Sequence, residues 1–491
     1  MSEKTSGPTP TAPSSADDQP LERALSNRHI QLMAIGGAIG TGLFMGSGKT
    51  ISVAGPSVIF VYMIIGFMLF FVMRAMGELL LSNLAYKNFS DFAGDLLGPW
   101  ASFFTGWTYW FCWIVTGIAD VVAIAHYVAF WWPNLPLWIP AVACILILLG
   151  LNLPTVRAFG ETEFWFALIK IVAILALIVT GLVMIIVGFE TDGARASFSN
   201  LWDNGGMFPT GFMGFVAGFQ IAVFAFVGIE LVGTAAAETK DPEKNLPRAV
   251  NSIPVRVLLF YVGALIILMA VRPWSDYSAD ESPFVGMFAL AGLVGAAGVV
   301  NFVVLTSATS SANSGIYSTS RMVYGLAREG DAPNGFGRLS SRRVPKNALV
   351  FSCMFLLAGV ALLYAEGSVA EAFTLVTTIS ALCFMFVWSI ILISYIVFRR
   401  RRPQLHAASS FKMPGGAFMP YVVLAFFGFI IWALTTQPDT LMALAFTPGW
   451  FLVLAIGYLV LRRNTQHGIL RAEHAAKVAA EHAERRAHLR G

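Results

Sequence analysis

Charged side chains are scarce in this sequence. Only 12% of its 491 residues are Asp, Glu, Lys or Arg, whereas soluble domains carry roughly 25%. Hydrophobic residues make up 57% of the chain, and the mean hydropathy is +0.70. Apolar runs of about twenty residues recur along the whole chain, and each is long enough to cross a bilayer. The composition therefore excludes an ordinary soluble globular protein and predicts an all-α polytopic membrane protein embedded in a lipid bilayer.

Cysteine and histidine are also scarce, with four and seven residues respectively. All the cysteines lie in apolar segments, so we expect packing residues rather than disulfides or metal ligands. Only His126 lies inside an apolar run, which argues against a metal site. The sequence has no HExxH zinc motif and no GxSxG nucleophile motif. We therefore expect no enzyme, no metal, no cofactor and no nucleic-acid partner.

The apolar runs predict about twelve transmembrane helices. Their expected boundaries are 29–53, 55–80, 100–131, 137–154, 161–188, 213–237, 255–274, 293–325, 348–365, 371–399, 417–436 and 442–462. Of the 32 basic residues, the loops on one side hold only Lys49, Arg195 and Arg272. Clusters such as Arg399 to Arg402 fall on the other side. The positive-inside rule therefore predicts that both termini are cytoplasmic.

Glycine, in contrast, is concentrated in the first predicted span. Residues 34–48 read AIGGAIGTGLFMGSG and contain six glycines, although each glycine in a helix interior costs about 1 kcal/mol relative to alanine. Helix packing is one explanation, because Gly36–Gly40 and Gly42–Gly46 have the small-xxx-small spacing. The other explanation is an unwound segment, whose free N–H groups bind an anion and whose free carbonyls bind an ammonium group.

A second interruption favours the ligand site. Residues 224–238, in the sixth predicted span, read FAFVGIELVGTAAAE. The second interrupted span begins five spans after the first, so the second copy enters the membrane from the opposite side. Paired interruptions in inverted halves mark the binding sites of many transporters, and a zwitterionic amino acid needs both kinds of backbone group.

Three stretches carry a family resemblance: NRHIQLMAIGGAIGTGLFMGSG at 27–48, FVMRAMGELLLSN at 71–83 and AAETKDPEKNLPRAV at 236–250. Together they resemble the amino acid permeases of the amino acid–polyamine–organocation superfamily, over residues 22–463. Stretches such as FQIAVFAFVGIELVGT look most like the bacterial permeases that carry D-serine, D-alanine and glycine with protons. The resemblance implies alternating-access uptake of these small neutral amino acids, with L-alanine as a further candidate. The implied driving force is the proton gradient across the bacterial cytoplasmic membrane.

The resemblance also implies a five-plus-five inverted-repeat core of the LeuT type, with its first and sixth helices unwound. On this layout the first repeat covers 22–200, the second covers 201–402, and two further helices cover 403–463. The polar residues 1–21 are expected to form a disordered cytoplasmic tail, and 464–491 a second cytoplasmic tail.

The resemblance further implies where the two ends of the substrate bind. The substrate carboxylate would bind the backbone N–H groups of Gly40, Thr41 and Gly42. Tyr109 matches a position beside the substrate.

The substrate ammonium group would face backbone carbonyls in both interruptions. In the first span these belong to Ala38 or Ile39, and in the sixth to Phe224 and Val227. Phe224 matches the aromatic residue that covers the substrate.

Lys170 lies nine residues beyond Glu161, or ~13 Å into the fifth span. Snorkelling to the cytoplasmic interface is one explanation of a lysine there. In similar transporters a lysine takes the place of a bound sodium ion, which implies that its ammonium joins the first interruption to hydroxyls of the eighth span. Ser311 is the expected hydroxyl, and this arrangement argues for proton coupling.

Three further ionisable positions stand out. Asp120, near the middle of the third span, must be protonated or paired, and we expect it to carry protons alternately with Lys170 unless its role is structural. Glu230 directly follows the second interruption. Similar proteins use such a glutamate in gating or coupling, so we rank it with Asp120 as a candidate coupling residue. Arg74 and Glu78 have the i, i+4 spacing, which predicts an ion pair on the surface of the second helix.

Two alternatives remain at this stage. Permeases for aromatic or cationic amino acids, or for γ-aminobutyrate, share these motifs. A channel or a non-transporting amino-acid sensor belongs to a different class. A channel would normally show rings of charged or carbonyl groups from a symmetric oligomer, whereas this chain has two inverted halves.

Overall fold

A computed structural model of the chain describes residues 25–36, 39–84, 86–191, 194–235, 238–279, 282–290, 295–364 and 369–462, together with 472, 476, 479 and 480. The predicted N-terminal tail at 1–21 and most of the predicted C-terminal tail at 464–491 lie outside these ranges. Ala38, one of the predicted substrate residues, also lies outside them.

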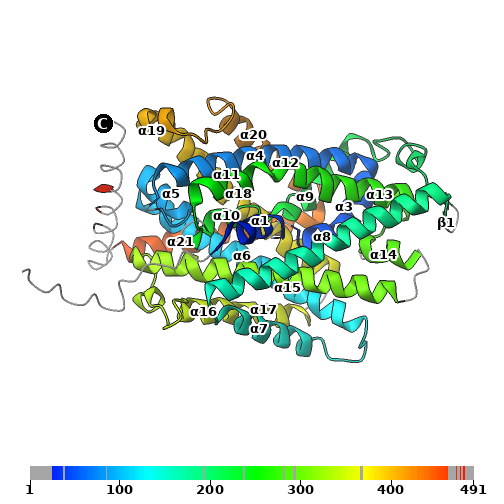
Figure 1. Cartoon of the computed structure of the whole chain (residues 1–491), viewed down its shortest axis with the longest axis horizontal. Helices are drawn as coiled ribbons and strands as arrows, with labels where there is room; N and C mark the ends of the chain where they lie inside the picture. Colours follow the sequence, from blue (N-terminus) through cyan, green and yellow to red (C-terminus); the bar gives the residue numbers. More distant parts are fainter. Residues whose placement is uncertain are drawn as a thin grey trace, which may run out of the picture.

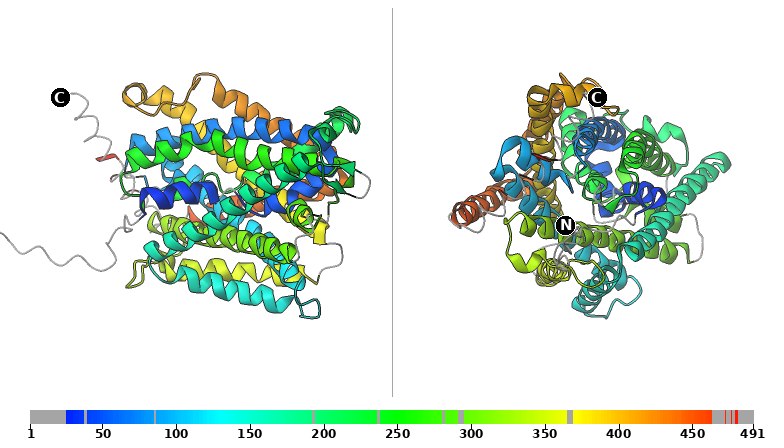
Figure 2. Two further views of the ribbon diagram at one scale, coloured as in Figure 1. Left: turned by 45° about the vertical axis from the view of Figure 1, so that its right-hand side comes forward. Right: turned by 60° about the vertical axis from the view of Figure 1, so that its left-hand side comes forward.

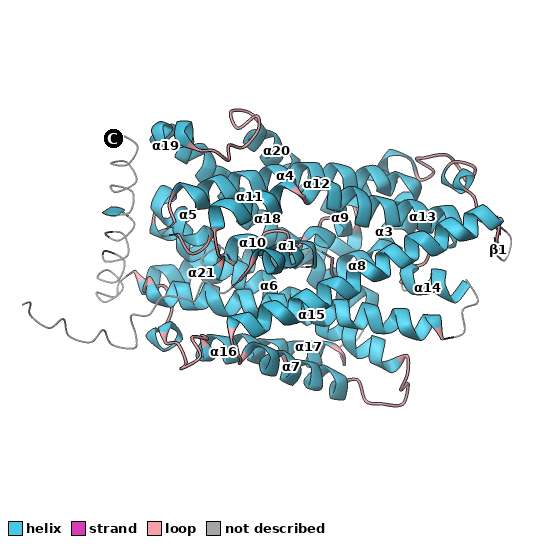
Figure 3. Ribbon diagram, viewed as in Figure 1, coloured by secondary structure: helices cyan, strands magenta, loops and turns pink. Residues whose placement is uncertain are grey.

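The described part of the chain is built almost entirely of helices (Figures 1 and 3). In chain order the α-helices are α1 (Asn27–Gly36), α2 (Thr41–Phe44), α3 (Gly46–Ala54), α4 (Val58–Ser82), α5 (Phe89–Leu97), α6 (Pro99–Ala129), α7 (Trp138–Asn152), α8 (Val156–Val187), α9 (Gly211–Ala222), α10 (Leu231–Thr234), α11 (Pro242–Asn251), α12 (Ile253–Arg256), α13 (Ala264–Val271), α14 (Pro283–Leu290), α15 (Ala296–Arg328), α16 (Lys346–Leu356), α17 (Ala358–Leu362), α18 (Val369–Arg401), α19 (Pro403–Ala408), α20 (Met419–Leu434) and α21 (Pro438–Leu461). The tighter or wider helical turns are η2 (Gly55–Ser57), η3 (Phe198–Leu201), η4 (Phe224–Phe226), η6 (Val257–Gly263), η7 (Trp274–Asp276) and η8 (Asn334–Gly337), of which η6 is a π-helix.

Two short extended pairings depart from the all-α prediction. Strands β1 (Glu190–Thr191) and β2 (Ala194–Arg195) form an antiparallel hairpin in which Glu190 lies opposite Arg195. Leu25 and Thr239 form an isolated parallel bridge, which joins the chain just before α1 to the segment after α10.

Seven helical stretches in the described residues are long and apolar enough to cross a membrane, and three shorter apolar helices accompany them. The long helices run roughly along the horizontal axis of Figure 1, with α5 and α19 at one end of the bundle and β1 at the other. Large apolar side chains remain exposed on the outer helices, for example Ile186 of α8, which is 81% exposed. Such side chains suit contact with lipid tails. The chain is therefore a multi-pass membrane protein.

The predicted boundaries agree with most of these helices to within a few residues. The seventh predicted span, 255–274, is composite, because α12 continues through the π-helical η6 into α13. Helices α5 and α19 were not predicted, because they are short and lack a long apolar run. The side chain of Asn88 starts α5 by accepting a hydrogen bond from the Ser90 N–H at 2.8 Å.

The first predicted interruption is present in the structure. Helix α1 ends at Gly36, and the backbone at Gly40 is extended (φ −123°, ψ −162°) before α2 begins at Thr41. Met45 keeps helical dihedrals between α2 and α3, so these two helices form one nearly continuous rod.

The second predicted interruption is also present. Helix α9 ends at Ala222, and the chain leaves the helical path after η4, where Val227 has a ψ of 136°. Gly228 has a φ of +97°, a conformation that favours glycine because a side chain would be strained there. Helix α10 then begins after Glu230.

The core of the bundle forms around two long helices. Helices α6 and α15 pack against each other, α18 packs on α6, and α8 packs on both α1 and α15. Figure 2 shows α1 inside the bundle rather than at its rim. Both interruptions are therefore surrounded by long, continuous helices that can position polar side chains around them.

Candidate substrate-binding and coupling site

The two interruptions touch each other. A Cβ added to Gly42 would lie 2.6 Å from the Cα of Ala225 and 2.9 Å from its backbone nitrogen. The same atom would lie 3.0 Å from the ring of Phe224. Because real Cβ atoms do not approach main chain so closely, only glycine allows α2 to pack against η4 here.

The first turn of α2 supplies the predicted carboxylate-binding groups. Gly40, the N-cap residue of α2, has no side chain that could cap the helix. The N–H groups of Gly40, Thr41 and Gly42 have no hydrogen-bond acceptor among the described residues. Thr41 is only 1% exposed. Buried N–H groups are normally paired, so these donors are suited to an anionic ligand at the positive end of the α2–α3 rod.

Two of the predicted ammonium acceptors already accept a hydrogen bond. The carbonyl of Ile39 accepts one from Ser307 Oγ at 3.2 Å, and the carbonyl of Phe224 accepts one from the Val227 N–H at 3.1 Å. A carbonyl oxygen has two lone pairs, so each can accept a second donor. The structure thus brings these carbonyls to the two interruptions.

The predicted aromatic cover, Phe224, is buried and packs edge-on against Phe373 of α18, with ring centroids 6.1 Å apart. Its neighbour Ala225 is fixed by the Tyr261 hydroxyl, which donates to the Ala225 carbonyl at 2.9 Å. The Phe224 ring therefore joins the second interruption to α18.

Asp120 is fully buried on α6 and contacts the first interruption directly. The Thr41 hydroxyl donates a hydrogen bond to Asp120 Oδ1 at 2.8 Å. Asp120 Oδ2 has no hydrogen-bond partner among the described residues. Ser311 also lies beside Gly40, since a Cβ on Gly40 would be 3.4 Å from Ser311 Oγ.

Lys170 is fully buried on α8, so it does not snorkel to the membrane surface. Its charge interacts with those of two carboxyl groups, Asp120 and Glu163. The structure therefore brings Lys170, Asp120, Thr41 and Ser311 to one region beside the first interruption.

Glu163 is a residue that the sequence prediction missed. It is 1% exposed and accepts hydrogen bonds from Ser310 Oγ at 2.9 Å and Asn313 Nδ2 at 2.6 Å, both on α15. Its spacing from Lys170 is i, i+7, which places both side chains on the same face of α8. That spacing could have identified Glu163 from the sequence.

Glu230 and Tyr109 form a separate polar contact. The Tyr109 hydroxyl donates to Glu230 Oε1 at 3.4 Å, and the Gly228 N–H donates to Glu230 Oε2 at 3.2 Å. Tyr109 precedes Asp120 by eleven residues on α6, which is roughly 16 Å along a helix axis. The structure thus places Glu230 and Tyr109 at a different level of the bundle from Asp120.

The predicted ion pair between Arg74 and Glu78 is wrong. Glu78 is fully buried and binds His406 Nδ1 at 2.6 Å and the Met413 N–H at 2.8 Å. Arg74 instead donates to Asn251 Oδ1 at 2.7 Å. The i, i+4 spacing failed because distant segments provide partners that compete with the pair along the helix.

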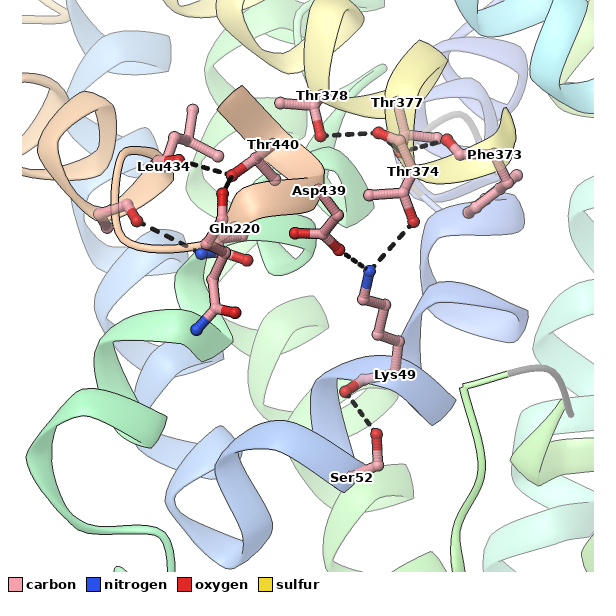
Figure 4. A network of polar contacts seen from close by, with 12 residues as sticks. Lys49, Ser52, Gln220, Phe373, Thr374, Thr377, Thr378, Leu434, Asp439 and Thr440 are labelled. Carbon is pink, nitrogen blue, oxygen red and sulfur yellow. Dashed lines mark hydrogen bonds and ion pairs between the residues drawn. The ribbon is translucent and has the colours of Figure 1, made fainter. Parts of the chain in front are cut away.

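A polar network links α3, the outer part of the first span, to α18 and to the start of α21 (Figure 4). Lys49 of α3 forms an ion pair with Asp439 of α21 and donates to Thr374 Oγ1 of α18 at 3.2 Å. Figure 4 shows the Lys49 ammonium group between these two acceptors. The contacts hold α3 against α18 and α21.

Comparison with known proteins bears on what these groups bind. A family model described as amino acid permease matches residues 29–469. The D-serine/D-alanine/glycine transporter of Escherichia coli (strain K12) is 65% identical over 448 residues, which cover 91% of this chain and 95% of that protein. The amino-acid permease AapA of Bacillus subtilis (strain 168) is 54% identical over 446 residues, covering 91% of this chain and 96% of its own length.

Proposed function

The chain belongs to the amino acid permease family, and we propose that it takes up glycine, D-alanine and D-serine together with protons. The proposed location is the bacterial cytoplasmic membrane, and the proposed mechanism is alternating access. The identity of 65% to a D-serine/D-alanine/glycine transporter supports this substrate range. L-Alanine, which differs from D-alanine only in handedness, is a further candidate substrate.

The contact between the two interruptions carries the proposal. Gly42 and Ala225 touch, so the N–H groups of α2 and the carbonyls of Ile39, Phe224 and Val227 lie within one small region. A zwitterion needs both kinds of group a few ångström apart. Inside a membrane, backbone N–H and C=O groups cannot form hydrogen bonds with bulk water. They are tolerated outside a helix where they line a site for a polar ligand. We therefore propose that the Gly40–Gly42 segment binds the substrate carboxylate.

Proton coupling is proposed for the region around Lys170 and Asp120. Both groups are fully buried, and their charges interact. A buried ammonium group removes the need for a sodium ion, and a buried carboxyl can hold a proton. Thr41 connects Asp120 to the substrate region through its 2.8 Å hydrogen bond. Ser311 is proposed to assist beside Gly40, and Glu230 to act in gating through Tyr109.

We also propose the twelve-span layout with two inverted repeats, 22–200 and 201–402, and cytoplasmic termini. Matching helix lengths support it. The third spans of the two halves would be α6 and α15, with 31 and 33 residues, and the fifth spans α8 and α18, with 32 and 33. The first span of each half is the interrupted one. Helices α20 and α21 would follow the core.

Uptake by purified protein in proteoliposomes tests the function. We expect saturable uptake of radiolabelled D-alanine that an inward proton gradient increases and a protonophore abolishes. Unlabelled glycine and D-serine should compete. Competition by phenylalanine, lysine or γ-aminobutyrate, but not by glycine, would instead indicate one of the related permeases.

A non-transporting sensor gives a different result in the same vesicles. It would bind D-alanine, as measured by a rise in melting temperature, without moving it across the membrane. Saturation and dependence on the proton gradient together separate a transporter from a sensor and from a channel.

A further inference from the structure

Glu163 is a buried carboxyl that the proposed mechanism does not yet use. It lies near the start of α8, is 1% exposed, and accepts hydrogen bonds from Ser310 and Asn313 of α15. Asn313 is itself held by Asn152 of α7, whose Nδ2 donates to Asn313 Oδ1 at 2.7 Å. Three helices thus hold the Glu163 carboxyl in place.

The charges around Glu163 do not balance. The buried Lys170 ammonium group attracts the Glu163 carboxylate, and the α15 neighbours of Glu163, namely Ser310, Asn313 and Ser314, are neutral. Lys170 also interacts with Asp120. One ammonium and two carboxylates would leave a buried net negative charge, which is costly in a membrane. One additional proton shared within this group removes that cost.

The position of Glu163 along α8 indicates toward which end of the helix the proton is released. Glu163 is seven residues closer than Lys170 to the start of α8, which corresponds to ~10 Å along the helix axis. Two residues further toward that end, Glu161 is partly exposed and contacts Arg28 and His29 of α1. Glu163 therefore lies between the buried Lys170 and the end of α8 that Glu161 and α1 occupy.

We propose that Glu163 is the proton acceptor on the cytoplasmic side of Lys170. The Lys170 ammonium gives one proton to the Glu163 carboxylate, which leaves a neutral amine and a carboxylic acid. The amine then takes the proton that Asp120 carries, and Glu163 releases its own proton to water at the cytoplasmic end. This inference rests on the proposed function, because it assigns a step of proton-coupled transport.

The test uses the full-length protein in proteoliposomes and the variants Glu163→Gln and Glu163→Asp. Substrate counterflow needs no net proton movement, whereas accumulation driven by a proton gradient does. For Glu163→Gln we expect accumulation, and substrate-dependent proton uptake reported by a trapped pH dye, to fall at least about tenfold while counterflow changes far less. Glu161→Gln, on the same helix but partly exposed, is the matched control and should accumulate D-alanine like the unaltered protein.

The aspartate variant separates proton transfer from a structural role. Glutamine keeps the length of glutamate, and its amide can accept a hydrogen bond from Asn313 and donate one to the Ser310 hydroxyl, but it cannot accept the proton. Aspartate keeps the carboxyl and is shorter. If Glu163 accepts protons, Glu163→Asp accumulates more D-alanine than Glu163→Gln. If Glu163 only anchors α8 to α15, the glutamine variant performs as well or better, and the proposal is overturned.

Failure of the proposed function would be visible separately. The unaltered protein would then show no counterflow of D-alanine at all, whatever residue stands at 163. Normal accumulation and proton uptake by Glu163→Gln, with active unaltered protein alongside, would overturn only the role of Glu163.

Discussion

Gly42 of the first broken helix lies directly against the main chain of Ala225 in the second. A Cβ at Gly42 would come within 2.6 Å of the Ala225 Cα, whereas a Cβ at Gly40 would meet only Ser311 Oγ at 3.4 Å. The two glycines therefore do different things. Gly42 allows the broken helices to pack together, and Gly40 leaves space beside the buried N–H groups at the start of α2.

This difference predicts that alanine destabilises the protein at position 42 but not at position 40. Gly42→Ala forces main chain apart and should destabilise the protein by about 1–3 kcal/mol, as overpacking usually does. Gly40→Ala makes an ordinary contact and should fold normally. Melting temperatures in detergent, followed by fluorescence-detected gel filtration, measure both. Equal melting temperatures for Gly42→Ala and the unaltered protein would mean that the two interruptions do not touch.

Lys170 provides a test of coupling. We expect Lys170→Ala to lose accumulation driven by the proton gradient, because the variant has no buried ammonium group to exchange protons with Asp120. Lys244, an exposed lysine on α11, serves as the control, and Lys244→Ala should behave like the unaltered protein. The measurement is D-alanine accumulation in proteoliposomes across a range of external pH. An unchanged pH dependence in Lys170→Ala would contradict the role of Lys170.

The contact between Lys49 and Asp439 predicts a small energetic effect. Their side chains are 23% and 37% exposed, and pairs that are open to water contribute about 0–1 kcal/mol. We expect Lys49→Met and Asp439→Asn each to lower stability by less than about 1 kcal/mol. Because both changes remove the same contact, the double variant should be little worse than either single variant. If the double variant lost as much free energy of unfolding as the two single variants together, the contact would contribute nothing to stability.

Asp91 predicts a pH dependence of stability. It is buried in α5, outside the membrane-spanning helices, and burial together with the nearby Glu329 carboxyl raises the pKa of Asp91 well above its usual range. A carboxyl whose pKa is raised by folding stabilises the protein below its unfolded pKa, and this stabilisation is lost as pH rises through the folded value. Stability should therefore decrease with rising pH in that range.

Replacing Asp91 tests whether stability decreases with rising pH for this reason. In Asp91→Asn the melting temperature should fall less between about pH 5 and pH 8 than in the unaltered protein. The Lys87 N–H donates to Asp91 Oδ2 at 2.8 Å, and an asparagine oxygen can still accept that hydrogen bond. Asp203→Asn, at an exposed position, should leave the pH profile as it is. A steeper profile in Asp91→Asn would refute the prediction.

Much of the site follows from local sequence. The glycines of 34–48 and the VGIE segment at 227–230 predict both interruptions, because backbone conformation depends on nearby residues. Asp120 and Lys170 could be identified because a charge in a long apolar run is costly wherever that run packs.

Partners across the bundle could not be predicted in the same way. Glu78 binds His406, which is 328 positions away, rather than Arg74 four positions away. Thr41 bonds to Asp120 across 79 positions. Such pairs depend on how each helix is rotated about its axis and which helix it packs against, and one sequence without its fold leaves both open.

The sequence by itself determined that the chain crosses a membrane many times and that its first and sixth spans are broken, because apolar length and glycine content act locally. Only the tertiary structure decided which buried charges meet. Gly42 lies against Ala225, and Glu163 shares Lys170 with Asp120, because packing of long helices brings together side chains that are distant along the chain.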